Sequence, residues 1–126
     1  MGLGVTRAAI GLMHQANLTL GASNAYLPKQ VDAFERELEA LEGTLVALAE
    51  TPLDGTPDYV RAVLTARLHT SELTLEAAQS ALLHAGARGF IEGSATSRVL
   101  RESYFVAIIT PSIKHLRQEL ETLGRH

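Results

Sequence analysis

Hydrophobic residues recur every three or four positions along most of the chain, which is the pattern of amphipathic helices. The clearest case lies at 31–48, where six apolar residues alternate steps of three and four: Val31, Phe34, Leu38, Leu41, Leu45 and Leu48. A seam of this kind packs against another helix at a shallow angle. Acidic residues cover much of the rest of this segment, and we interpret them as a solvated face.

Two longer segments share this period. The first runs from about 5 to 26 and ends before Pro28, because the residue that precedes a proline is pushed out of the helical conformation. The other covers 57–85, with Thr56 as its cap and Pro57 at its first helical position. Apolar residues spread around more than one face of 57–85. We therefore expect neighbours on several sides of this helix and place it at the centre of the fold.

Two shorter helices are expected towards the end of the chain. Ser94 or Thr96 can begin a helix whose apolar residues include Phe105. Thr110 and Pro111 repeat the cap-plus-proline start for a last helix.

Gly124 is a natural stop for this last helix, and 104–110, which reads YFVAIIT, is the one place where a strand could stand instead. The pattern predicts a single all-α domain over 1–126. Its expected form is an antiparallel up-and-down four-helix bundle with a short extra C-terminal helix.

Composition narrows the class of function. The 126 residues carry a net charge of −3, with 11 scattered Lys and Arg residues, which argues against nucleic-acid binding. The absence of cysteine excludes disulfides and thiolate metal sites. No apolar run reaches the roughly 18 residues of a membrane span, so we expect a cytoplasmic protein without a membrane partner.

Residue spacing offers little support for a metal or a nucleophile. None of the five histidines has a histidine three or four positions away, as a helical metal site needs. His69 and Glu72 could share a face, but the repeated Glu-x-x-His pattern of a di-metal bundle is missing. We predict no metal site, and no nucleophile elbow or phosphate-binding P-loop is found.

The glycine-rich segment GARGFIEG at 86–93 has two possible interpretations. Gly86 suits a helix C-cap, Gly89 and Gly93 allow positive φ, and Arg88 could reach the last helical carbonyls, which makes the segment a structural turn. Alternatively, exposed amide groups and Arg88 receive an anion such as a cofactor pyrophosphate.

The stretch LLHAGARGFIEGSATSRVLRESYF resembles the late segment of acyl-CoA dehydrogenases, where a long helix ends in a Gly-Gly-x-Gly-(Tyr/Phe) loop. A helix with an Arg-Asp or Arg-Glu pair follows that loop. The equivalent residues in this chain are Gly86, Ala87, Arg88, Gly89 and Phe90, followed by Arg101 and Glu102. The remaining helices, including TPSIKHLRQEL at 110–120, are similar to that family's C-terminal α-helical domain, but only 80–121 is specific.

The resemblance implies a domain that covers FAD in the complete enzyme and mediates contacts between subunits. By the same resemblance, Gly86, Arg88, Gly89 and Phe90 form the cofactor-side loop, and Arg101 anchors the helix after it. The N-terminal helical domain and the middle β-domain of the family are absent, so we expect the isolated chain not to hold FAD. Glu92 is a weak candidate for the catalytic base, because it stands one residue before the family position, which is Gly93 here.

Three hypotheses follow. The first is a stand-alone interaction or assembly module, not catalytic by itself, that forms a homodimer or larger homo-oligomer through the 31–48 or third-helix surface. The second is the small subunit of a split FAD-dependent acyl-CoA dehydrogenase, an oxidoreductase whose partner chain supplies the flavin site. The third is a fragment of a longer protein.

Overall fold

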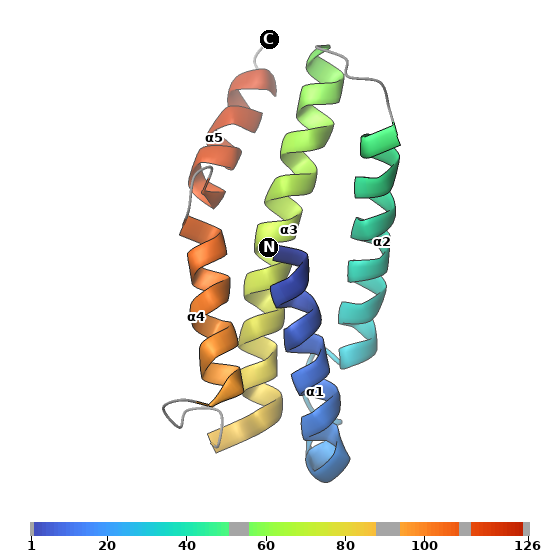
Figure 1. Cartoon of the computed structure of the whole chain (residues 1–126), viewed down its shortest axis with the longest axis vertical. Coiled ribbons are helices and arrows are strands. Elements are labelled where there is room, and N and C mark those ends of the chain that lie inside the picture. Colours follow the sequence, from blue (N-terminus) through green and yellow to red (C-terminus); the bar gives the residue numbers. More distant parts are fainter. Residues whose placement is uncertain (1, 51–55, 88–93, 109–111, 125–126) are drawn as a thin grey trace.

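Residues 2–50, 56–87, 94–108 and 112–124 are described by the computed structural model, and in these residues there are five helices and no strand (Figure 1). In chain order the helices are α1 (Gly2–Asn24), α2 (Val31–Glu50), α3 (Pro57–Ala85), α4 (Ala95–Ile108) and α5 (Ile113–Gly124). The all-α class is confirmed for this part of the chain. Residues 104–108, where a strand was an alternative, belong to α4.

The longest helix, α3, is the centre of the fold, as the apolar residues on more than one of its faces predict. It contacts each of the other four helices. α4 and α5 follow one another along one side of α3, α2 lies on the opposite side, and α1 runs beside the half of α3 that ends at Ala85 (Figure 1). This arrangement is compatible with an up-and-down bundle.

Local capping explains the bounds of α3, which coincide with the prediction. The Thr56 side chain accepts a hydrogen bond from the Tyr59 N–H at 3.3 Å, and Pro57 occupies the first helical position. At the other end Gly86 has a φ of 70° and its N–H bonds to the Leu82 carbonyl. A positive φ favours glycine, so the structural role predicted for Gly86 is confirmed.

The start of α5 was predicted wrongly. The helix begins at Ile113 rather than at Thr110 and Pro111, which lie outside the described residues. The cap is Ser112, whose Oγ accepts a hydrogen bond from the His115 N–H at 3.4 Å and lies 2.9 Å from His115 Nδ1. Serine is among the best N-caps, and here its side chain takes the role that was given to Thr110.

The apolar seam of α2 packs inward. Phe34 is 1% exposed and Leu41 is 2% exposed, and Val31, Leu38 and Leu45 pack against the same core cluster. Burial of a phenylalanine and a leucine contributes several kcal/mol. Phe34 and Leu41 of this seam are therefore used inside the molecule and are not accessible to a second copy.

The first turn of α1 approaches α3 very closely. A Cβ atom at Gly2 would lie 2.7 Å from Thr70 Cγ2 and 3.2 Å from Thr74 Oγ1. The Gly2 carbonyl oxygen is 2.8 Å from the Thr6 hydroxyl and 3.0 Å from the Thr74 hydroxyl, and the two hydroxyls are 2.9 Å apart. Because Thr6 and Thr74 are fully buried, these bonds satisfy groups that would otherwise destabilise the core.

Candidate functional site

α3 ends and α4 starts at the same end of the bundle, on either side in sequence of the segment 86–93. Ser94 caps α4: its Oγ accepts a hydrogen bond from the Ser97 N–H at 3.1 Å, and its carbonyl accepts one from the Arg98 N–H at 3.0 Å. One of the amide groups that a free helix N-terminus would offer to an anion is thus already bound. Of the two predicted starts, Ser94 and Thr96, the structure selects Ser94.

Most residues of the predicted cofactor loop lie outside the described residues: Arg88, Gly89, Phe90 and Glu92. Gly86 is described and closes α3. Arg101 is described too, and it lies exposed on α4 with its guanidinium Nη1 3.2 Å from Ser97 Oγ. It does not line the pocket described next, so the described residues do not bring Gly86 and Arg101 together at one site.

A pocket of about 640 Å³ opens beside this end of the bundle. One wall is a single face of α1, formed by Leu12, Gln15, Ala16, Thr19 and Leu20. The other wall is the last residue of α3, Ala85, together with residues 94–96 at the start of α4. None of the lining residues that the structure describes is charged. Sequence periodicity shows that α1 is amphipathic, but only the packing of three helices creates this pocket.

A buried polar network joins the end of α1 to the end of α3. The Asn24 side-chain amide donates hydrogen bonds to Asn17 Oδ1 at 2.8 Å and to the His84 carbonyl at 3.1 Å. The Gln30 amide binds the Asn24 and Leu27 carbonyls, at 3.0 and 2.8 Å. These bonds satisfy the free carbonyls at the end of α1 and hold its turn against α3.

His84 is fully buried, and this burial was not predicted from the sequence. Its Nδ1 lies 2.7 Å from the Ser80 carbonyl, so Nδ1 carries the proton and donates, and Nε2 has no hydrogen-bond partner in the described part of the chain. The signal was present in the spacing, since Ala77, Ala81 and His84 follow steps of four and three along the buried face of α3.

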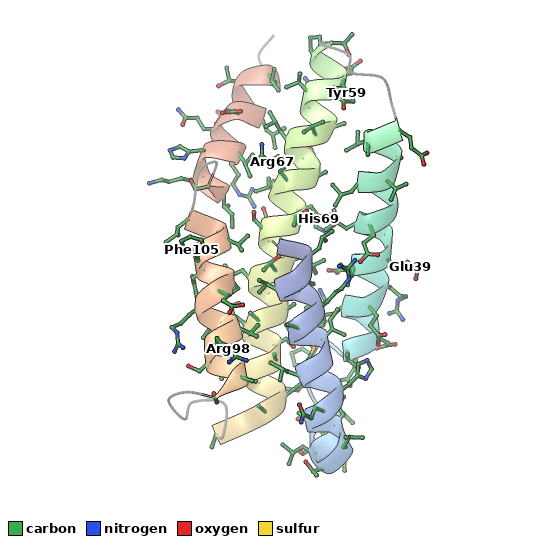
Figure 2. The ribbon with its side chains drawn as sticks, in the orientation of Figure 1. Glu39, Tyr59, Arg67, His69, Arg98 and Phe105 are labelled. Atoms are coloured by element: carbon green, nitrogen blue, oxygen red, sulfur yellow. The ribbon has the colours of Figure 1, made fainter. Side chains whose placement is uncertain are left out.

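The outer side of α4 carries exposed apolar side chains. Tyr104, Phe105 and Ile108 are 46%, 55% and 69% exposed, and Phe105 lies on the side of α4 away from α3 (Figure 2). Phe105 follows the buried Val99 by six residues, which turns it about 240° around the helix. Its neighbours at helical spacing are Arg98, Arg101 and Glu102, and all three are exposed. We call Arg98, Arg101, Glu102 and Phe105 the α4 stripe.

One lysine connects the base of α2 to α3. Lys29 Nζ lies 2.9 Å from Glu37 Oε1, forms a second ion pair with Glu76, and sits 4.4 Å from the centre of the Phe34 ring. Burial tends to lower the pKa of Lys29, but the hydrogen bonds and charges of Glu76 and Glu37 outweigh it and raise the pKa above its ordinary value.

The described residues hold no group of three or more side chains suited to a metal ion. Glu72, which could have shared a face with His69, instead pairs with Arg117 at 2.5 Å. In the same part of the chain, no helix has both the length and the apolar character needed to cross a membrane.

Comparisons with protein-family models, with curated proteins and with solved structures find no match to the chain. The resemblance to acyl-CoA dehydrogenases therefore depends on the residues quoted above, and what it implies remains a hypothesis.

Proposed function

We propose that this protein is a self-associating module, built on an up-and-down four-helix bundle, that acts through assembly rather than catalysis. The observation that carries the proposal is the α4 stripe with its exposed Phe105. Aromatic residues and arginine are enriched at the centres of protein interfaces. Phe105 also lies near the exposed Tyr104 and Ile108, and exposed apolar groups of this kind mark interaction surfaces.

The occupant that we propose for the α4 stripe is the same stripe of a second copy. Most homo-oligomers are two-fold symmetric. Two α4 helices can pair antiparallel about a two-fold axis that passes between residues 101 and 102. In this register Arg101 of each copy lies opposite Glu102 of the other copy. The same register places Arg98 opposite the Phe105 ring, which suits a cation–π contact. Tyr104 and Ile108 lie beside the stripe.

This pairing predicts weak association. A helix of 14 residues offers less than the roughly 800 Å² per partner of a standard stable interface. We therefore expect a dissociation constant in the micromolar range, measured by sedimentation equilibrium over a range of protein concentrations. A protein that stays monomeric at the highest concentration would contradict the proposal.

Charge reversal tests the register. Arg101→Glu or Glu102→Arg alone places like charges opposite each other and should weaken the dimer at least about 10-fold. The double variant, with both changes, restores opposite charges and should return the dissociation constant to near that of the native chain. The matched control is Glu39→Arg on α2, at the opposite edge of the bundle (Figure 2), which should leave association unchanged.

A second candidate function is the small subunit of a split FAD-dependent acyl-CoA dehydrogenase, and the pocket lined by Ala85 and Ser94, which flank the predicted cofactor loop in sequence, favours it. The described lining of that pocket is uncharged, so the two phosphates of FAD would depend on Arg88 or on the partner chain. Co-expression with the partner should then yield a complex that absorbs visible light as a flavin does, with activity that Glu92→Gln removes. A colourless complex would exclude this function.

A further inference from the structure

We propose that the pocket between α1, the end of α3 and the start of α4 binds a small, uncharged and mainly apolar molecule. This proposal is independent of self-association, because the pocket lining and the α4 stripe share no residue.

The shape of the pocket suits an elongated ligand. The five α1 residues of its wall span Leu12 to Leu20, which is about 12 Å along a helix at 1.5 Å per residue. The volume of about 640 Å³ lies inside the ~300–1,000 Å³ of typical small-molecule sites. A molecule that lies along α1 would contact all five residues of this wall.

The chemistry of the described lining favours an uncharged ligand. Five of its residues are alanine or leucine: Leu12, Ala16, Leu20, Ala85 and Ala95. The polar residues among the described lining, which are Gln15, Thr19, Ser94 and Thr96, are all neutral. Among the described residues, a charged group that enters the pocket would give up part of its hydration without gaining an ion-pair partner, which disfavours its binding.

The edge of the pocket supports the same ligand class. Leu20 is 39% exposed, so a ligand that covers it gains the free energy of removing leucine surface from water. The Ser94 hydroxyl binds the Ser97 N–H, which leaves the start of α4 less able to attract an anion. Both features favour a hydrocarbon body over a phosphate or carboxylate group.

Fluorescence of the neutral dye N-phenyl-1-naphthylamine tests the site in the full chain. We expect saturable binding that decanol displaces and that decanoate or decylammonium displaces at least about 10-fold less well. Ala16→Phe, which fills the pocket, should weaken dye binding at least about 10-fold. The matched control is Ala22→Phe, an exposed position of α1 outside the lining, which should bind the dye as the native chain does.

A second variant keeps the test decisive if Ala16→Phe does not fold. Thr19→Lys places an ammonium group at an exposed position of the wall, so decanoate should become a better competitor than decanol. Phe105→Ala should bind the dye unchanged even when the dimer is lost. No saturable binding, equal displacement by decanol and decanoate in the native chain, or an unchanged preference in Thr19→Lys would each overturn the proposal.

Discussion

α2 and α4 lie on opposite sides of α3 and use their aromatic residues in opposite ways. α2 turns Phe34 and Leu41 into the core and leaves most of its acidic residues outside. α4 buries small and β-branched residues, such as Val99, Ser103 and Val106, and leaves Phe105 outside. The presence of an aromatic residue on an amphipathic helix therefore does not by itself predict that the residue is buried.

The largest expected contrast between the two helices is the effect of removing their phenylalanines. Phe34→Ala leaves a cavity in the core and should lower the free energy of unfolding by ~3–5 kcal/mol. Phe105→Ala should change the free energy of unfolding of the monomer by no more than ~0.5 kcal/mol, while it weakens association about 10-fold or more. Denaturant unfolding at a protein concentration below the dissociation constant measures the first effect, and sedimentation measures the second. Equal losses of stability would show that the two sides of the bundle do not differ as described.

An intermediate effect is expected where α1 approaches α3. Gly2→Ala introduces a Cβ atom 2.7 Å from Thr70 Cγ2, and Thr70 is held by a 2.9 Å hydrogen bond from its hydroxyl to the Ala66 carbonyl. The overpacking should cost ~1–3 kcal/mol in thermal or denaturant unfolding. Gly4→Ala is the matched control, because nothing lies within 4 Å of its Cβ position. It should stabilise α1 by up to ~1 kcal/mol, and a loss at Gly4 as large as at Gly2 would refute the close contact.

The smallest effect concerns Lys29, which holds the base of α2 on α3. The pKa of Lys29 is raised in the folded state. The stabilisation that its ion pairs give to the folded state is therefore fully present below the unfolded pKa of about 10.4. That contribution is lost as the pH rises through the higher folded pKa. The loss should stay below ~1 kcal/mol, because both carboxylates are partly exposed. The measurement is the free energy of unfolding of the native chain and of Lys29→Met as the pH rises above ~10. The difference between the two proteins gives the loss that is due to Lys29. Parallel pH profiles of the two proteins would show that Lys29 does not contribute.

Helix positions were largely predictable because their causes are local. Thr56 and Pro57 start α3 and Gly86 ends it, and each acts through its own backbone or through atoms a few residues away. The central place of α3 was also readable from its apolar residues on several faces. The start of α5 was missed because two plausible caps, Thr110 and Ser112, stand two residues apart. The hydrogen bonds from the His115 N–H to Ser112 Oγ and from the Leu116 N–H to the Ser112 carbonyl identify Ser112 as the cap.

The candidate sites were less predictable. The sequence pointed to segment 86–93, and the structure adds a pocket lined by the flanking residues Ala85 and Ser94, whose α1 wall lies some 70 residues earlier in the chain. The sequence also offered the 31–48 or third-helix surface as an interface between copies, and Phe34 and Leu41 of the 31–48 seam are buried in the core of the monomer. We propose the α4 stripe as that interface because Phe105 is exposed and has no neighbouring helix on its side of α4 among the described residues.

By itself, the sequence determined the all-α class, the extent of α3 and the cap at Gly86, since periodicity and capping depend on residues within a few turns. Only the tertiary structure decided that His84 is buried, that Phe105 is exposed, that Gly2 touches Thr70, and that a pocket lies between α1 and α4. The physical reason is that the burial of a side chain depends on which helices pack around it, and those helices lie far apart in the sequence.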